Sequence, residues 1–257
     1  MTTTTRRSAS ETTAETQQGS AHGWWRAPHA VRQVLLAVLT LATGAVDALS
    51  WLMLGKVFSA FMTGNLVFLG LLAGGAQGPD TTHVAVAIAA FAVGAAIGGR
   101  VTASVRNQEQ WWPLQVSVAL GCTAVLEAGA LGVWATSDAH PSGTTVAAIV
   151  GLFAMSMGIQ TVAIASLGVR GIFTTAATAT LAILMGDTAG WAHVKGEAPR
   201  LISIVVALVA GAAIGGLLVE QAPLWAPLVP VCLTLLVVAG AELLLGDRSL
   251  SVELPES

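Results

Sequence analysis

The stretch Phe91-Ala-Val-Gly-Ala-Ala-Ile-Gly-Gly99 returns almost unchanged as Leu208-Val-Ala-Gly-Ala-Ala-Ile-Gly-Gly216. Both copies lie within long apolar segments, and both contain a Gly-x-x-x-Gly motif at the same position. This similarity indicates an internal duplication and predicts two tandem homologous repeats. Duplicated membrane folds often place a substrate or ion site where their halves meet.

The composition predicts a membrane protein. Of the 257 residues, 54% are hydrophobic and 10% are charged, and the mean hydropathy is +0.76, whereas soluble domains carry roughly 25% charged residues. The net charge is −3, and no basic cluster with interleaved aromatic residues points to nucleic acid. Cys122 and Cys232 lie within apolar segments, where we expect them to pack rather than to form a disulfide. The expected partner is the lipid bilayer.

Eight apolar segments approach the roughly 20 residues that a membrane-spanning helix needs. They are 34–54, 57–76, 83–103, 114–135, 144–168, 171–190, 201–219 and 226–246. Four fall in each half of the chain. The predicted organisation is therefore a disordered cytoplasmic tail with a basic flank (1–33), a first membrane repeat (34–135), a second membrane repeat (144–246) and a short polar C-terminal tail (247–257).

The distribution of basic residues favours six crossings over eight. With a cytoplasmic N-terminus and eight crossings, four basic residues would fall outside: Lys56, Arg100, Arg106 and Arg170. If the second and sixth segments enter and return on the same side, only Lys56 falls outside, which agrees better with the positive-inside rule. We therefore predict an all-α polytopic membrane helical bundle with six crossings plus two broken or re-entrant segments. Eight full crossings remain the alternative.

Residue types within the second and sixth segments support this topology. The second contains Thr63-Gly64-Asn65, and glycine and asparagine are poor helix formers. The sixth is rich in threonine and includes Thr178. Irregular backbone at membrane depth is tolerated where it is buried in protein or lines a wet cavity.

The duplicated glycines predict close helix packing. Small residues four apart lie on one helix face and let two backbones approach. The four glycines in question are Gly94, Gly98, Gly211 and Gly215. We expect them to pack the third and seventh segments against each other at a pseudo-twofold axis. A homodimer interface is the alternative.

Isolated polar residues are the candidates for a binding site. Asp47 is a lone carboxylate in the first segment, where it costs roughly 2.5–3.5 kcal/mol to insert, and Trp51 shares its helix face. The repeat alignment pairs Asp47 with Gln160, which suggests a shared central cavity. The alternative is that Asp47 only caps the broken segment beside it.

Further polar residues follow the same argument. Thr63, Gly64 and Asn65 could bind ions or polar groups through an interrupted helix, or could make interhelical hydrogen bonds. Glu127 lies near the middle of the fourth segment without an acidic counterpart, so it is either functional in one half or a local partner to a neighbouring helix. Glu242 and Asp187 lie near segment ends and are expected to be structural.

The run Thr43–Trp51, continued by Leu54–Phe58 and Met62–Gly70, resembles the YoaK family. The second-half residues Met157–Gln160, Leu167-Gly168 and Thr174-Thr175 resemble its second signature, so the resemblance covers about 35–250. It implies a bacterial multi-pass membrane protein of unknown function and marks five residues: Asp47, Thr63, Gly64, Asn65 and Gln160. This chain departs from the family pattern at Thr161, where Asn is usual, and at Phe61, where Ala-Asn usually precedes Met-Thr-Gly-Asn.

Two classes of function agree with these features. The first is a transporter of a small solute or ion, with a central polar site between the repeats formed by the first, second, fifth and sixth segments. The second is a non-transporting scaffold, assembly factor or sensor that uses its N-terminal tail. We do not expect an enzyme, a cofactor or a metal site, because no motif or His/Cys spacing supports one.

Overall fold

A computed structural model describes residues 28–105, 110–168, 185 and 198–245. Six helices in this part of the chain are long and apolar enough to cross a membrane. They are α2 (Pro28–Met53), α4 (Thr81–Val101), α5 (Leu114–Ala135), α6 (Thr144–Ser166), α8 (Ala198–Gln221) and α9 (Leu228–Leu245), the last preceded by the short 3₁₀ helix η3 (Pro223–Trp225). The described residues are otherwise connections and one short helix, so the all-α polytopic bundle is confirmed.

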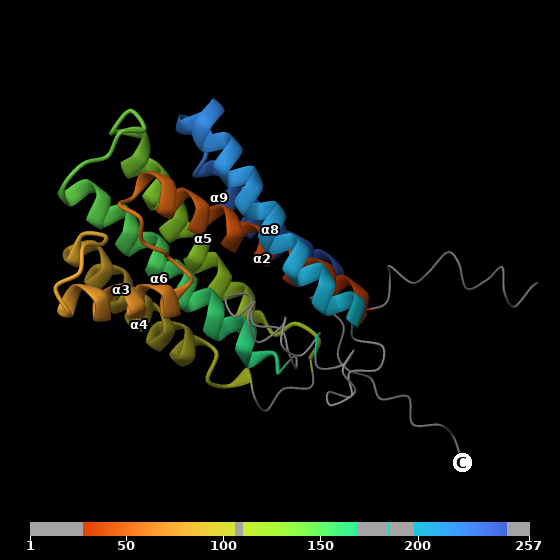
Figure 1. The fold of residues 1–257 in the computed structure, drawn as a ribbon. Coiled ribbons are helices and arrows are strands. Elements are labelled where there is room, and N and C mark those ends of the chain that lie inside the picture. Colours follow the sequence, from red (N-terminus) through yellow and green to blue (C-terminus); the bar gives the residue numbers. More distant parts are fainter. Residues whose placement is uncertain (1–27, 106–109, 169–184, 186–197, 246–257) are drawn as a thin grey trace, which may run out of the picture.

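The second apolar segment does not form a membrane-spanning helix. Instead of 57–76, only α3 (Met62–Ala73) is helical, with 12 residues. Such a helix spans roughly 18 Å, well short of the about 30 Å of a hydrocarbon core. In Figure 1 the chain turns back from the end of α2, and α3 then runs beside α4 at the edge of the bundle. The sixth apolar segment, 171–190, lies outside the described residues except for Met185.

The helices pack in an order that pairs the two halves. α8 lies along α2, and α4 lies along α6, while α5 and α9 contact each other and complete the bundle (Figure 1). α2 and α6 are the central helices: 61% of the apolar window of each is buried, against 22% for α4 and 28% for α8. Each central helix is thus covered by an outer helix from the other half.

The glycines explain how these helices approach so closely. A Cβ atom on Gly44 would collide with the backbone of α8 at Leu208, and a Cβ atom on Gly158 would collide with the backbone of α4 at Phe91. Phe91 and Leu208 are the first residues of the two repeated stretches. The same contact therefore occurs twice, once in each half, which supports an internal repeat.

The Gly-x-x-x-Gly motifs correct one expectation. Gly94 and Gly98 approach Met155 and Ile159 of α6, and Gly211 and Gly215 approach Leu41 and Ala45 of α2. The third and seventh segments therefore do not use these glycines to pack on each other. Instead, these small residues bring each outer helix onto the central helix of the opposite half, where a Cβ atom would collide with the backbone of that central helix.

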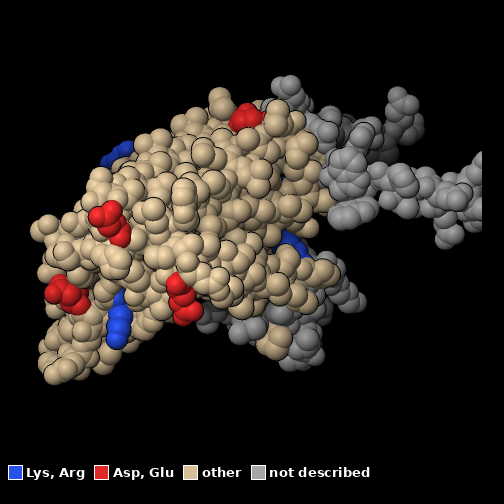
Figure 2. All heavy atoms as spheres, turned by 90° about the horizontal axis from the view of Figure 1, so that it is seen from above, with Lys and Arg blue, Asp and Glu red and all other residues tan. Residues whose placement is uncertain are grey.

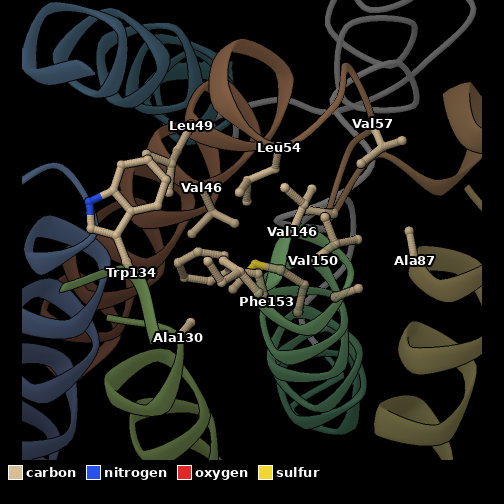
Figure 3. Close-up of a cluster of buried hydrophobic side chains, with 14 of the residues drawn as sticks. Val46, Leu49, Leu54, Val57, Ala87, Ala130, Trp134, Val146, Val150 and Phe153 are labelled. Carbon is tan, nitrogen blue, oxygen red and sulfur yellow. The ribbon is translucent and has the colours of Figure 1, made fainter. Parts of the chain in front are cut away.

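Two buried apolar clusters fill the bundle. One lies toward the starts of α2 and α5 and includes Leu36, Leu39 and Leu120. The other lies around the end of α2 and the residues that follow it, where Leu49, Leu54 and Val57 meet Phe153 of α6 and Trp134 of α5 (Figure 3). The indole Nε1 of Trp134 donates a hydrogen bond to the carbonyl oxygen of Pro223 at 3.0 Å. The second cluster fixes the chain that follows α2 against α6.

The outer surface is apolar over broad areas. Figure 2 shows few charged side chains on the face in view. Large hydrophobic residues are widely exposed, among them Leu243 at 84% and Val125 at 72%. Soluble monomers rarely expose large contiguous apolar areas, whereas lipid tails solvate them. The surface therefore agrees with a bundle embedded in a bilayer.

Candidate functional site around a re-entrant segment

The re-entrant segment, residues 54–61, connects α2 to α3 without regular structure. Its first turn needs left-handed backbone, because Gly55 has φ +87° and Lys56 has φ +58°. Glycine adopts this conformation without steric cost. A Cβ atom on Gly55 would also lie 2.7 Å from Nδ1 of His83. Gly55 thus allows the chain to leave α2 and turn back beside it.

Asp47 anchors the middle of this segment. Its Oδ1 atom accepts hydrogen bonds from the backbone N–H groups of Ser59 at 2.9 Å and Ala60 at 2.8 Å. These amides have no helical partner, and an unsatisfied backbone group in hydrocarbon costs several kcal/mol. A carboxylate is a strong acceptor for such groups. The contacts agree with the alternative expected from the sequence, in which Asp47 holds the broken segment.

Two further pairs of polar groups complete the anchoring. The hydroxyl groups of Ser50 and Ser59 lie 2.8 Å apart and are both fully buried. Asn65, also fully buried, donates from Nδ2 to the Phe58 carbonyl at 2.6 Å and accepts at Oδ1 from the Phe58 N–H at 3.0 Å. The sequence analysis did not identify the two serines, although Ser50 lies on the same helix face as Asp47.

Aromatic side chains cover the outer face of the segment. Trp51 stacks on Phe58 with ring centroids 5.1 Å apart, and Phe58 meets Phe61 edge to face at 5.3 Å. A Cβ atom on Gly64 would lie 2.7 Å from the Phe61 ring. Trp51 is 38% exposed and Phe61 is 40% exposed, and Thr63 is exposed as well. Of the residues singled out in the sequence, Asp47, Trp51, Gly64 and Asn65 meet around this segment.

Gln160 lies in a different contact. Its Nε2 atom donates to Thr43 Oγ1 at 2.9 Å, and the residue is fully buried between α6 and α2. Asp47 and Gln160 each bind a separate partner, so the structure does not join them in one cavity. The expected pairing of the two in the repeat is also wrong. Gly44 matches Gly158, and both helices continue unbroken, so Asp47 matches Thr161.

The remaining candidates fall elsewhere. Thr178 and Asp187 lie outside the described residues. Glu242 is exposed on α9, whereas Glu127 is fully buried on α5. Neither of these acids contributes to the re-entrant segment.

Comparison with known proteins agrees with the membrane architecture. The family described as "Protein of unknown function (DUF1275)" matches residues 35–240. The chain is 38% identical over 161 residues to the UPF0700 transmembrane protein YoaK of Bacillus subtilis (strain 168), an alignment that covers 63% of this chain and 69% of that protein. No solved structure matches. The chain is therefore a multi-pass membrane protein that belongs to the DUF1275 family, to which no function has been assigned.

Proposed function

We propose that this protein transports a small polar solute or an ion across the bacterial plasma membrane, with its N-terminus in the cytoplasm. We place the transport path along the re-entrant segment and α3. The proposal assigns no chemical reaction to the protein. The observation that carries it is the anchoring of the irregular backbone between α2 and α3 by Asp47, Ser50 and Asn65.

An irregular backbone segment in a membrane protein has an energetic cost. A continuous helix would satisfy every backbone group internally, so a fold that only needed to sit in lipid would use one. Here residues 54–61 depart from helical structure. The half-buried Asp47 and the buried Asn65 satisfy three of their backbone N–H groups and one of their carbonyl groups. Transporters commonly use interrupted segments because freed amides and carbonyls can bind an ion or a polar group.

The segment has a polar side and an apolar side. Asp47 is half-buried, and its Oδ1 atom accepts hydrogen bonds from the N–H groups of Ser59 and Ala60. Trp51 and Phe61 offer partly exposed aromatic faces next to it. An aromatic face beside a carboxylate suits a small polar or cationic solute.

Flux through reconstituted vesicles tests the proposal. The purified protein is incorporated into liposomes, and swelling on a panel of neutral solutes and dye-reported ion fluxes are compared with protein-free liposomes. We expect protein-dependent flux of at least one solute. We expect Asp47→Ala to abolish it and the exposed-site control Glu242→Gln to leave it unchanged. If Asp47→Ala does not yield monodisperse protein, Asp47→Asn replaces it in the flux assay. This variant keeps an acceptor oxygen but removes the charge, and we expect it to lower the flux.

A flux result of zero across the panel contradicts transport and favours the scaffold or sensor alternative. That alternative makes a different prediction for the N-terminal tail. Deletion of residues 1–21 would abolish the activity of a protein that works through its tail, whereas a transporter should keep its flux after the deletion.

A further inference from the structure

Glu127 is the least explained ionisable group among the described residues. It lies in the interior of α5, and its side chain is fully buried. Neither carboxyl oxygen has a hydrogen-bond partner among the described residues. By contrast, Asp47 accepts two backbone hydrogen bonds. Burial of Glu127 therefore serves neither the re-entrant segment nor an observed polar network.

A polar side chain that faces Glu127 is Thr234 on α9. Its hydroxyl faces Glu127 but lies outside hydrogen-bond geometry, and it too is fully buried without a partner. The facing pair brings together the fourth apolar segment of each repeat, where α5 meets α9. Two unsatisfied polar groups thus face each other at the contact between the halves.

Charged groups on the helices around α5 do not compensate Glu127. α6 contains no titratable residue. On α9, Cys232 and Glu242 are both exposed. On α4, His83 lies in the first turn and Arg100 in the last, with Arg100 exposed. No described cation therefore forms an ion pair with the Glu127 carboxyl.

Burial without a partner determines whether the Glu127 carboxyl group is charged or neutral. A buried carboxylate without an ion pair or hydrogen bonds is so costly that the group becomes neutral instead. A metal cation would also neutralise it, but hard cations require about six oxygen ligands. Among the described residues, Glu127 belongs to no group of three or more His, Cys, Asp or Glu side chains that could hold a metal ion. A single proton needs no more than one acceptor.

We propose that Glu127 is a proton-binding site at the contact between α5 and α9. It carries a proton at neutral pH, and the acid O–H is placed to donate to Thr234 Oγ1 after a small rotation of either side chain. α9 has no equivalent buried acid, because its one acid, Glu242, is exposed. This inference is independent of the transport proposal, since it concerns only the protonation of the folded protein.

Infrared spectroscopy of the reconstituted protein tests the site directly. A protonated carboxylic acid has a carbonyl stretch above the amide bands, and this band shifts in heavy water. We expect the band at neutral pH in the wild type and in the control Glu242→Gln, and its loss in Glu127→Gln. A wild type without the band, or a band that survives Glu127→Gln, overturns the proposal.

A second measurement does not require a folded variant. Apolar carbodiimides react with protonated carboxyl groups inside membranes, and the modified residue can be located by peptide mass spectrometry of the wild type. We expect modification at Glu127 that decreases as the pH is raised. Modification of another acid in the protein shows that the reagent is active. If that acid is modified and Glu127 carries no pH-dependent adduct, the result contradicts a bound proton at Glu127.

Discussion

Asn65 binds both backbone polar groups of Phe58, with its amide donating to the carbonyl at 2.6 Å and its oxygen accepting from the N–H at 3.0 Å. These two hydrogen bonds join the re-entrant segment to the first turn of α3, because Phe58 and Asn65 are seven residues apart in the chain. The Thr-Gly-Asn motif is thus explained locally: Gly64 gives room to the Phe61 ring, and Asn65 replaces the hydrogen bonds that a helix would supply.

Replacing Asn65 by Ala should destabilise the protein. The change leaves a buried N–H and a buried C=O unsatisfied, and each such group costs about 1–3 kcal/mol. We expect a lower thermal unfolding midpoint in detergent by fluorescence. Thr63→Ala, at an exposed position two residues away, should be close to neutral. Equal effects of the two substitutions would contradict the anchoring role of Asn65.

The contact between Thr43 and Gln160 can be tested with a close control. Thr43→Val removes the acceptor of Gln160 Nε2 within a fully buried site, and we expect a loss of about 1–3 kcal/mol of stability. Thr40→Val is the control, because the recorded hydrogen bond of Thr40 runs only to the Leu36 carbonyl of its own helix. A larger loss for Thr40→Val than for Thr43→Val would show that the contact does not hold α2 to α6.

The glycine contacts predict a steric effect. Gly158→Val places side-chain atoms against the α4 backbone at Phe91 and Ala95, and backbone cannot yield as a flexible side chain can. We expect a loss at the upper end of about 1–3 kcal/mol, seen as aggregation or a lowered unfolding midpoint. Gly70→Ala is the control, since nothing lies within 4 Å of its Cβ position. Normal stability of Gly158→Val would contradict the α4–α6 packing.

Asp80 makes the stability depend on pH. It lies before α4, and its carboxylate accepts hydrogen bonds from the N–H groups of Thr82 at 2.7 Å and His83 at 3.4 Å. The Thr82 N–H is the main cause that holds the pKa of Asp80 below its ordinary value of 3.8. Because the pKa of Asp80 is lower in the folded than in the unfolded protein, its charge stabilises the fold at pH values above the pKa of the unfolded state. This stabilisation is lost as the pH falls through the pKa of the folded state.

Asp80→Asn should therefore be less stable than the wild type at neutral pH, with the difference shrinking below the ordinary aspartate pKa. Unfolding midpoints measured for both proteins across this range check the sign. A difference that stays constant in acid would indicate that the charge of Asp80 has no role.

Much of the architecture was predictable because it depends on patterns that a sequence displays. Eight long apolar runs together with the positions of the basic residues predict six membrane helices. The expected break at Thr63-Gly64-Asn65 was misplaced, because these residues form the start of α3 and the irregular backbone lies just before them, at 54–61. The hydrogen bonds that Asp47 accepts from the N–H groups of Ser59 and Ala60 agree with one of the two roles expected for this lone carboxylate.

Other features depend on packing between distant segments. The partner of Gly94 could not be predicted, because a small-residue face shows that a helix packs closely but not on which helix. The pairing of Asp47 with Gln160 was wrong by one residue, because the short sequence similarity followed Leu54-Gly55 and Leu167-Gly168, whereas helix contacts match Gly44 with Gly158. The burial of Glu127 against Thr234 depends on where α9 lies, which no local pattern encodes.

The membrane topology of the re-entrant segment is the most direct test of this account. Lys56 and Gly78 lie on either side of α3, and both are exposed. Single cysteines at these positions, in a background with Cys122 and Cys232 replaced by alanine, are labelled with a membrane-impermeant thiol reagent in oriented cells. His140→Cys, between α5 and α6, serves as the reference position.

We predict that Lys56→Cys, Gly78→Cys and His140→Cys are all labelled from the same side of the membrane. This result requires that the chain enters between α2 and α4 and returns without crossing. Labelling of Lys56→Cys and Gly78→Cys from opposite sides would mean that the segment crosses, and it would contradict the re-entrant arrangement on which the proposed function rests.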